Sequence, residues 1–512
     1  MKILLAYQSG KPNRNDPYIS LVPTGLCYLH ACLLEAGYDS ILANFSGWSE
    51  SKIRQELVNI KPEVVGISQW THNRHSSLEL ADWCRQLLPD CKIIMGGGHA
   101  TFCRDEILTD ASAVDIIIIG EGEQTVLDLL DHFAKSTDWC EVPGLAFRKN
   151  GSIITTAPRK LLADLDQLPQ PARYLDNSIG IDLELQPEFI VTARGCPSSC
   201  HFCSSPAFWG KKVRFRSPQD IVEEILYIRQ KFGLIYFSIR DDTFTADRKR
   251  AIEFCSLLVK HRANILWNCQ SRVTAIDEEL LVMMKMAGCE CIQLGVESGS
   301  PRILQQLGKN ITPAQITHAG KLIREIGINL SIYLISDVTD ETADDLKQTI
   351  NLVRSIHPDD GYVSPLAYYP GTQLFKNAVA SGDVDVRIFE NRSDNALYVK
   401  TTQGDSSSRL LKVISNNRQD DPLRFRKQKE RLGFCYTTNA LAGEWYRLRR
   451  EYKSAETEFR EITSQQPENP WGWFLLGELY AERGRGKQAA ECYRYVLEIV
   501  PRHAPSLASL TT

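Results

Sequence analysis

The chain has 512 residues, of which 43% are hydrophobic and 24% charged, so it can bury several hydrophobic cores. This composition excludes a disordered chain and a short disulfide-stapled one. The 59 basic and 63 acidic residues give a formal net charge of -4, which offers no bulk electrostatic attraction to nucleic acid or to an anionic membrane.

The ends and the cysteines indicate the compartment. The N-terminus MKILLAYQSG lacks the long apolar core and cleavage site of a signal peptide, and no stretch approaches the roughly 18 apolar residues of a membrane span. The odd count of 15 cysteines in an unexported chain favours thiols or metal ligands over disulfides. We therefore expect a cytoplasmic protein without a membrane span.

Residues 1–155 alternate short apolar runs with amphipathic segments such as 25–37. The runs are MKILLAY (1–7), SILAN (40–44), EVVGIS (63–68), KIIMGG (92–97) and DIIIIG (115–120). Apolar runs separated by helical segments are typical of a parallel sheet covered by helices on both faces. We predict an α/β domain with a doubly wound parallel sheet here, followed by a proline-containing linker over 156–185.

Residues 186–375 continue the alternation of strands and helices. Six more apolar runs are FIVTAR (189–194), LIYFSIR (234–240), NILWNCQ (264–270), CIQLGV (291–296), NLSIYLI (329–335) and GYVSPLAYY (361–369). A helix-period segment follows each of the first five, and the first of these helices begins with Ser217 as N-cap and Pro218 and ends before Gly233. The pattern predicts a partial (β/α)6 barrel.

The C-terminal part divides in two. Residues 376–435 carry clusters of Asn, Asp, Ser and Arg and are expected to be irregular or partly mobile. Residues 436–512 repeat with the spacing of the tetratricopeptide helix-turn-helix pattern, which predicts an all-α region. The repeated positions are Trp473, Leu476, Gly477, Tyr480, Ala489, Tyr493, Val496 and Pro501, and, earlier, Ala442, Gly443, Tyr446, Ala455, Phe459, Ile462 and Pro467. Two repeats bury little alone, so they are expected either to cap the barrel or to bind a partner protein.

Cys196, Cys200 and Cys203 stand in C-x3-C-x2-C spacing directly after the first strand of the predicted barrel. Three thiolates suit a [4Fe-4S] cluster with one open iron. The alternative is a structural or zinc-binding thiol cluster, but zinc needs four ligands and the extra candidate is His201, inside the motif. Cys269, Cys289 and Cys291 lie at strand and helix-end positions that indicate packing.

With this spacing and Phe202 before the third cysteine, the chain resembles the radical S-adenosylmethionine (SAM) superfamily over roughly 185–375. The resemblance implies that the open iron chelates SAM, which one electron cleaves to methionine and a 5'-deoxyadenosyl radical. Polar residues at successive strand ends are the expected SAM contacts, with an acidic acceptor for the ammonium group, Arg272 for the carboxylate and Glu297 for the ribose hydroxyls. The strand-end residues are Asp241, Asp242, Arg272, Glu297 and Ser298, and Phe202 of the cysteine motif completes the expected set. The segment ISDVTDET (335–342) departs from the Gly-Pro-Gly-Glu type turn of many relatives.

The first domain resembles the cobalamin-binding module that precedes many radical SAM barrels. The matching segments, in the same order, are VPTGLCYLHACLLEAGY (22–38), VVGIS (64–68), GGGHAT (96–101) and DIIIIGEGEQT (115–125). Glycines at strand ends let a flat macrocycle or its nucleotide tail approach the backbone. The expected cobalamin contacts are Ser68, Gln69, Trp70, Gly96, Gly97, Gly98, His99, Gly120, Glu121 and Gly122.

The axial ligand of cobalt is a separate question. The Asp-x-His-x-x-Gly pattern that supplies an imidazole to cobalt is absent, and the early loop reads QSGKPNRNDPY (8–18). We expect no histidine below the metal, with Gln69 or Trp70 facing it. His99 taken alone is expected to be a structural hydrogen-bonding residue.

Together these resemblances imply a cobalamin-dependent radical SAM methyltransferase that acts on an unactivated carbon, or less often phosphorus, of a small-molecule or peptide natural product. One alternative keeps both cofactors but catalyses ring formation, rearrangement or oxidation without methyl transfer, and another is a non-catalytic repeat scaffold with a vestigial barrel. The expected partners are the substrate, a one-electron donor such as flavodoxin or ferredoxin, and a protein at the repeats if these do not merely cap; no nucleic acid is expected. Substrate-facing residues are expected in 204–216 and 366–430, where Phe208, Trp209 and Arg214 either line the pocket or pack.

Overall fold

The computed structural model describes residues 1–10, 21–390, 393–400, 406–417 and 421–511. The chain forms two compact units that interleave along the sequence. The first consists of Met1–Gln186, Gly195–Arg214 and Ala367–Tyr398, and the second of Pro187–Arg194, Phe215–Leu366 and Val399–Thr512. The cysteine loop therefore belongs to the same unit as the N-terminal sheet.

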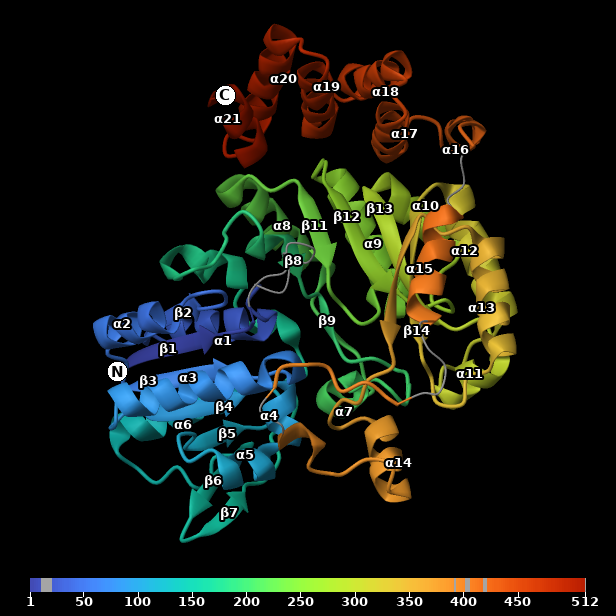
Figure 1. Cartoon of the computed structure of the whole chain (residues 1–512). Coiled ribbons are helices and arrows are strands. Elements are labelled where there is room, and N and C mark those ends of the chain that lie inside the picture. Colours follow the sequence, from blue (N-terminus) through green and yellow to red (C-terminus); the bar gives the residue numbers. More distant parts are fainter. Residues whose placement is uncertain (11–20, 391–392, 401–405, 418–420, 512) are drawn as a thin grey trace. The chain divides into compact units, whose positions relative to one another are not determined.

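The first unit is built on a seven-stranded sheet with the order β2-β1-β3-β4-β5-β6-β7 (Figure 1). Its strands are β1 (Lys2–Tyr7), β2 (Asp39–Asn44), β3 (Val64–Ser68), β4 (Lys92–Gly96), β5 (Ile116–Ile118), β6 (Leu145–Lys149) and β7 (Ser152–Thr155). Strands β1 to β5 are parallel, which confirms the predicted parallel sheet, and Ser68 at the end of β3 pairs with Gly96 at the end of β4. The ends of β3, β4 and β5 therefore lie side by side at one edge.

An antiparallel hairpin, β6–β7, extends this sheet beyond the five predicted strands. The two strands join through Asn150 and Gly151, which both have positive φ (52° and 78°). Asn-Gly between two strands is a strong hairpin signal because both residues adopt this conformation at low cost. The signal was present in the sequence.

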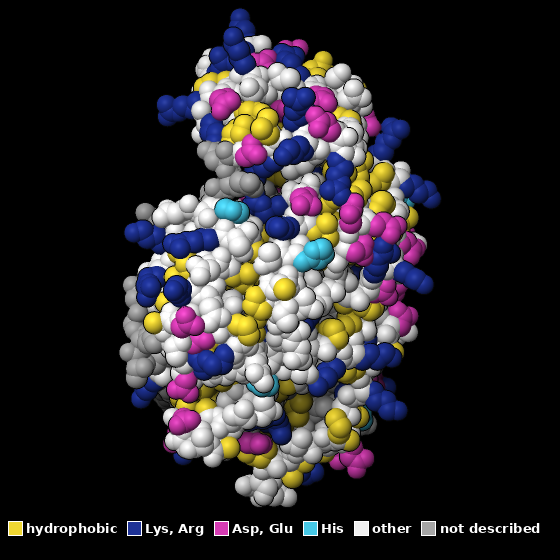
Figure 2. Space-filling view, turned by 90° about the vertical axis from the view of Figure 1, so that its right-hand side faces the viewer, with side chains coloured by type: hydrophobic (Ala, Val, Ile, Leu, Met, Phe, Trp, Pro, Cys, Tyr) yellow, Lys and Arg dark blue, Asp and Glu magenta, His cyan; other side chains and the backbone are white. Residues whose placement is uncertain are grey.

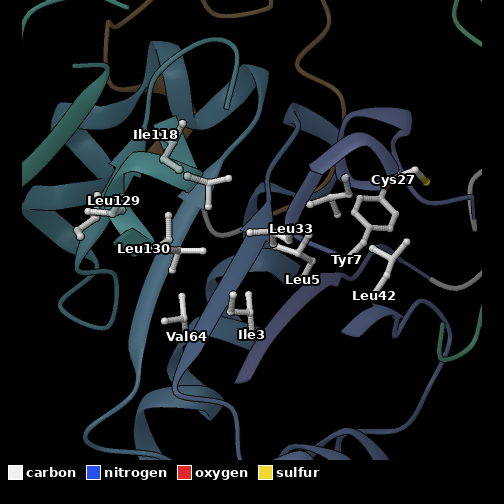
Figure 3. Close-up of a cluster of buried hydrophobic side chains, with 14 of the residues drawn as sticks. Ile3, Leu5, Tyr7, Cys27, Leu33, Leu42, Val64, Ile118, Leu129 and Leu130 are labelled. Carbon is white, nitrogen blue, oxygen red and sulfur yellow. The ribbon is translucent and has the colours of Figure 1, made fainter. Parts of the chain in front are cut away.

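Helices cover this sheet and bury its apolar side chains. They are α1 (Thr24–Glu35), α2 (Glu50–Ile60), α3 (Arg74–Leu87), α4 (Gly98–Phe102), α5 (Arg104–Asp110) and α6 (Glu123–Lys135). Figure 3 shows one core cluster, in which Leu33 of α1 and Leu129 and Leu130 of α6 lie with strand residues such as Leu5 and Val64. The linker 156–185 contains the 3-10 turns η3 (Leu165–Gln167) and η4 (Pro171–Asn177), and its Ile179 carbonyl accepts a hydrogen bond from the Asn44 N–H at 2.8 Å.

The second unit contains a six-stranded sheet with the order β15-β14-β13-β12-β11-β8, parallel throughout. Its strands are β8 (Phe189–Ile190), β11 (Tyr236–Ile239), β12 (Leu266–Ser271), β13 (Cys289–Glu297), β14 (Asn329–Ser336) and β15 (Asp360–Pro365). Each expected apolar run gives one of these strands. The run FIVTAR, however, is interrupted after Ile190 and resumes as the short β9 (Ala193–Arg194), because the Thr192 N–H bonds the Asp241 carboxylate instead of a strand.

Helices alternate with these strands as predicted. They are α8 (Pro218–Phe232), α9 (Arg248–Lys260), α10 (Glu278–Met286), α11 (Pro301–Gln306), α12 (Pro313–Ile326) and α13 (Ala343–Ile356). Ser217 caps α8 by accepting a hydrogen bond from the Asp220 N–H, and Gly233 ends it with φ of 77°. The predicted boundaries of this helix are confirmed.

The expectation of an irregular segment at 376–435 is wrong in part. The structure has α14 (Gln373–Ser381), the turn η7 (Ile388–Glu390), α15 (Ser406–Asn416) and α16 (Leu423–Leu432). Helix α15 buries Leu410 and Ile414. The Ile414 side chain packs so closely on β15 that a Cβ added to Gly361 would be 3.1 Å from its Cδ1 atom. This apolar pair was masked by the polar clusters NRSDN, GDSSSR and NNRQDD, which fall partly outside the described residues.

The C-terminal region is helical. It consists of α17 (Tyr436–Leu448), α18 (Tyr452–Gln465), α19 (Pro470–Glu482), α20 (Gly486–Ile499) and α21 (Ala504–Thr511). A Cβ added to Gly443 would be 2.1 Å from the Phe459 ring, and one added to Gly477 would be 2.7 Å from the Tyr493 ring. The small and aromatic positions therefore face each other, as the repeat pattern predicts.

These helices cover the N-terminal ends of the second sheet's strands. The Tyr436 hydroxyl donates to the Ile265 carbonyl at 2.6 Å, and the Thr437 hydroxyl donates to the Lys285 carbonyl at 3.0 Å. Ile235 and Leu266, at the start of β11 and β12, belong to the same apolar cluster as Trp471 of α19. The C-terminal helices thus seal the end of the sheet opposite to the strand ends predicted to bind SAM.

The surface carries both signs of charge. On the face shown in Figure 2, Lys and Arg side chains are intermingled with Asp and Glu. None of the described helices has the length and apolar character needed to cross a membrane.

Lys285 of α10 is fully buried where the C-terminal helices pack against the second unit's sheet. Its Nζ donates to the Gly327 carbonyl at 2.5 Å. Burial lowers the pKa of Lys285 to about 8, from an ordinary value of 10.5. Below pH 8 the folded protein must hold a buried ammonium group, and that cost disappears as the pH rises from 8 to 10.5, because the folded lysine loses its proton first.

We expect Lys285→Met to remove a rise in the free energy of unfolding between pH 8 and 10.5, on the order of 3 kcal/mol. Urea unfolding at several pH values measures this rise. The control is Lys347→Met, an exposed position on α13. An identical pH dependence in wild type and Lys285→Met would show that Lys285 is not the group responsible.

Candidate functional site

The three cysteines of the C-x3-C-x2-C motif lie on one loop of the first unit, just before α7 (Ser205–Trp209). Cys196 is buried, and Cys200 and Cys203 are half-buried. The chain before the loop and the chain after α7 lie close together: Gly195 has φ of 103°, and a Cβ there would be 2.8 Å from the Lys212 carbonyl. Only glycine fits this approach.

The fifteen cysteines all lie within the described residues and form no disulfide. No group of three or more His, Cys, Asp or Glu side chains in the described part of the chain stands ready-made for a metal ion. Burial raises the pKa of Cys269, Cys289 and Cys291, which disfavours the thiolate form that metals bind.

Helix α7 attaches this loop to the carboxyl edge of the first sheet. The Phe208 ring lies 6.3 Å from Trp70, 6.3 Å from Phe102 and 4.6 Å from Trp209. Phe208 and Trp209 therefore pack, one of the two roles expected for them. On the other side of the loop, the Leu374 N–H donates to the His201 carbonyl at 2.8 Å.

The residues predicted to contact cobalamin gather at the ends of β3, β4 and β5. Gly97 has φ of 100°, and a Cβ there would be 2.6 Å from the Gln69 carbonyl oxygen. A Cβ on Gly98 would be 3.0 Å from the Trp70 ring, whereas Gly120 (φ 73°) has nothing within 4 Å. Gly96 and Gly122 show ordinary van der Waals distances. Gly97 and Gly98 thus let the Gln69 backbone and the Trp70 ring pack closely against this edge, and Gly120 leaves open space beside it that a flat ligand could use.

Gln69 and Trp70 differ in orientation. The Gln69 side chain is fully buried and its Nε2 donates to the Arg74 carbonyl at 2.9 Å. Trp70 is half-buried, and its indole N–H is buried without a partner among the described residues. The Gln69 Oε1 atom is likewise buried without a partner among the described residues, so the two residues expected to face cobalt differ only in that the Trp70 side chain is partly exposed.

The nearby histidines are engaged in the fold. His99 is buried, its Nδ1 lies 3.2 Å from the Thr71 hydroxyl, and burial lowers its pKa to about 3. His72 Nε2 lies 2.8 Å from the Tyr7 hydroxyl, and burial lowers its pKa too. His75 Nε2 lies 3.6 Å from Glu79. Residues 11–20 of the early loop lie outside the described residues, so the missing cobalt-ligand motif rests there on sequence alone.

Glu121 does not point away from the protein at this edge. Its carboxylate is 8% exposed and lies 2.7 Å from Arg214 Nη1, which is on a side chain 6% exposed. The same carboxylate accepts a hydrogen bond from the Leu162 N–H at 3.1 Å. The structure thus gives Glu121 a protein partner that sequence reasoning did not foresee.

In the second unit, Asp241 and Asp242 follow β11 but differ in environment. Asp241 is buried and accepts hydrogen bonds from the Thr192 N–H (2.6 Å), the Ala193 N–H (2.9 Å) and the Thr192 hydroxyl. Burial raises the pKa of Asp241, while these donors and Arg250 oppose that rise. Asp242 is exposed. Asp241 thus holds the strand before the cysteine loop, and Asp242 is the better placed of the two to meet a ligand.

Glu297 and Ser298 end β13 and also diverge. Glu297 has positive φ (64°), and its Oε1 lies 2.7 Å from Lys309 Nζ, with both side chains 8% exposed. The Ser298 hydroxyl lies 3.1 Å from the Thr349 hydroxyl of α13, inside the fold. Lys309 was missed because it stands in a turn after α11, where no spacing connects it with β13. Arg272, after β12, is half-buried.

The side chains of β12 to β15 that alternate with the core residues are polar but mostly uncharged. The ladder pairs Gln270 with Gln293, and Gln293 with Ser331. One step further, Tyr333 pairs with Tyr362, and their rings stack with centroids 5.3 Å apart. Amides, a hydroxyl and phenols on one face can hydrogen-bond a polar ligand.

Two sequence models of known families match the chain. The "Radical SAM superfamily" matches residues 190–353, and the "B12 binding domain" matches residues 15–130. An uncharacterized methyltransferase of Pyrococcus horikoshii is 30% identical over 367 residues, which cover 70% of this chain and 79% of that protein. An anaerobic magnesium-protoporphyrin IX monomethyl ester cyclase of Rubrivivax gelatinosus is 30% identical over 409 residues, covering 78% and 73%.

Among solved structures, the radical S-adenosylmethionine methyltransferase TsrM from Kitasatospora setae, with cobalamin and a [4Fe-4S] cluster bound, is similar with a TM-score of 0.65. It is 15% identical and the match covers 91% of this chain and all of that one, so the likeness concerns the fold. The cofactors indicated by the two family matches are a [4Fe-4S] cluster, SAM and cobalamin. The thiols of the cysteine loop suit the cluster, and the open space at Gly120 beside the ends of β3, β4 and β5 suits cobalamin.

We expect replacement of Cys196, Cys200 and Cys203 by Ala together to abolish iron binding, the thiolate-to-iron absorption and reductive SAM cleavage. Iron analysis and absorption after anaerobic reconstitution measure this. The controls are Cys269→Ala and Cys289→Ala, buried thiols of the second unit, which should retain the cluster. Retained SAM cleavage in the triple variant would disprove the assignment of the ligands.

The engaged histidines lead to a second expectation, concerning cobalt. Electron paramagnetic resonance of the protein with Co(II) cobalamin should lack the three-line splitting that an axial nitrogen-14 ligand produces. His72→Ala, His75→Ala and His99→Ala should leave the spectrum unchanged. A three-line pattern that disappears in one of these variants would identify that histidine as the axial ligand.

Proposed function

We propose that this chain, which belongs to the cobalamin-binding radical SAM enzymes, is a methyltransferase that moves a methyl group from SAM, by way of cobalamin, to an unactivated carbon or phosphorus atom. The observation that carries the proposal is that the cysteine loop and the glycine edge belong to one compact unit and meet through Phe208 and Trp70, 6.3 Å apart. Groups held by these two segments are neighbours, as a transfer between them requires.

The residues divide the work as follows. Cys196, Cys200 and Cys203 hold the cluster, and Asp242, Arg272 and Glu297 bind SAM through its ammonium, carboxylate and ribose groups. When bound, the cluster supplies an electron to SAM and cobalamin carries the methyl group. Asp241 positions the strand before the cysteine loop through its three bonds to Thr192 and Ala193. Lys309 orients the Glu297 carboxylate.

In this proposal Trp70 would shield cobalt when cobalamin is bound. An indole ring has no lone pair to donate to the metal, so Trp70 would leave cobalamin free to serve as a methyl carrier. Gln69 Nε2 donates a hydrogen bond to the Arg74 carbonyl, which stabilises the turn that carries Trp70.

The substrate is expected to carry hydrogen-bonding groups, because Gln270, Gln293 and Ser331 form a row on one face of the second sheet. A wholly hydrocarbon substrate would leave these groups without partners. A small-molecule or peptide natural product with polar groups meets this requirement. The reaction also needs a one-electron donor, for which flavodoxin or ferredoxin is suitable.

The C-terminal helices, which we interpret as tetratricopeptide-like, act in this proposal as a structural cap. Tyr436 and Thr437 bond directly to backbone carbonyls below β12 and β13. The capping role was one of two options from the sequence, and these buried contacts favour it over partner binding.

Ring formation without methyl transfer is the second candidate, favoured by the 30% identity to the cyclase of Rubrivivax gelatinosus. The by-products distinguish the two. A methyltransferase produces S-adenosylhomocysteine as well as 5'-deoxyadenosine, whereas the cyclisation needs only the radical.

We expect the reconstituted enzyme with SAM and a reductant to form S-adenosylhomocysteine in proportion to its bound cobalamin. Gly97→Ala should weaken cobalamin binding about tenfold or more, because a side chain there has a strained φ and meets the Gln69 carbonyl, while iron binding and formation of 5'-deoxyadenosine persist. The control is Gly37→Ala, with φ of 83° but nothing within 4 Å. Formation of 5'-deoxyadenosine without any S-adenosylhomocysteine in the wild type would refute methyl transfer.

A further inference from the structure

Glu121 lies in the GEGE turn after β5, a position that the sequence assigns to cobalamin, yet its carboxylate is used inside the protein. Both of its oxygens face Arg214 Nη1, at 2.7 and 2.9 Å, and one of them also accepts the Leu162 N–H. A buried carboxylate with these partners is satisfied, so contact with a cofactor would require breaking a buried ion pair.

Arg214 connects this turn to two other segments of the first unit. Its Nη1 donates to the Leu162 carbonyl of the linker at 2.8 Å, and its Nη2 donates to the Trp209 carbonyl at 3.4 Å. Trp209 is the last residue of α7, which begins two residues after Cys203. The buried ion pair therefore joins three segments: the turn after β5, which lies at the edge predicted to bind cobalamin (the cobalamin edge), the linker, and the end of α7 behind the cysteine loop.

The cysteine loop is consequently attached to the cobalamin edge twice. One attachment is the aromatic contact of Phe208 with Trp70 and Phe102, and the other is the ion pair behind Trp209. Two attachments on a helix of five residues fix its orientation as well as its distance.

We propose that Glu121 and Arg214 are positioning residues, which set the spacing between the cluster loop and the cobalamin edge, and that Glu121 is not a cobalamin contact. The inference rests on the proposed function, in which the same SAM site serves both methyl donation to cobalamin and reductive cleavage. Methyl donation needs the two cofactor sites aligned, whereas cleavage needs only the cluster and SAM. A displacement of about 1 Å can cost about a hundredfold in rate, so the pair should affect the first reaction far more than the second.

The test compares Glu121→Gln, Arg214→Gln and the double variant in the reconstituted full-length enzyme. Three quantities are measured: the dissociation constant of hydroxocobalamin by absorbance, the iron content, and the spin interaction between reduced cluster and Co(II) cobalamin, which depends on their separation. We expect the first two to stay within about twofold of wild type, and the spin interaction to weaken together with a 10- to 100-fold loss of S-adenosylhomocysteine formation. The double variant should be no worse than Arg214→Gln, which leaves a buried carboxylate without its cation.

The matched control removes another ion pair of the same linker. Arg159 Nη2 lies 2.6 Å from Asp128 of α6, so Asp128→Asn should leave all these quantities at wild-type values. A tenfold weaker cobalamin affinity in Glu121→Gln with normal affinity in Arg214→Gln would make Glu121 a cobalamin contact and overturn the proposal. An unchanged spin interaction in both single variants would overturn it equally. If the wild type forms no S-adenosylhomocysteine, the proposed methyl transfer fails, but affinity and spin interaction still decide the role of the pair.

Discussion

Parallel strands all end at the same edge of a sheet, and this constraint organises both units. In the first unit it brings the ends of β3, β4 and β5 together, where glycines allow neighbouring turns to pack closely. In the second unit it brings together the residues that follow β11, β12 and β13. The geometry of the parallel strands therefore brings together residues that are far apart in the sequence. The local environment of each side chain then determines which polar groups face a ligand and which hold the edge in place.

The roles of these polar side chains are predicted least well from the sequence. The apolar runs predict the strands well, because a strand buried on both faces needs an uninterrupted run, and Ser217, Pro218 and Gly233 predict the limits of α8 for equally local reasons. The polar residues at strand ends were predicted as one set, but the structure divides them. Asp241 and Ser298 bond within the fold, whereas Asp242 is exposed. A carboxylate satisfies itself on backbone N–H groups when the neighbouring strand offers them, and that neighbour is known only once the sheet is assembled.

The same limit applies to long-range pairs. Arg214 is 93 positions from Glu121, and Lys309 lies in a turn with no periodic relation to Glu297. No local sequence pattern predicts such ion pairs, because they depend on how loops from different segments pack together. Helix α15 was missed for another reason: its two buried positions, Leu410 and Ile414, are surrounded by polar residues that suggest a loop. In contrast, the C-terminal helices repeat their small and aromatic positions, so their pairing was visible in the sequence.

The interleaving of the two units has a consequence for biosynthesis. The first unit is completed by Ala367–Tyr398, more than 180 residues after the end of its first segment. On the ribosome, the N-terminal sheet emerges long before the segment that bonds the carbonyl of His201 in the cysteine loop. Domains that are contiguous in sequence can fold as they are synthesised, but this unit is complete only after all strands of the second sheet have been made. The cysteine loop thus gains its neighbour at Leu374 only after the second sheet has been synthesised.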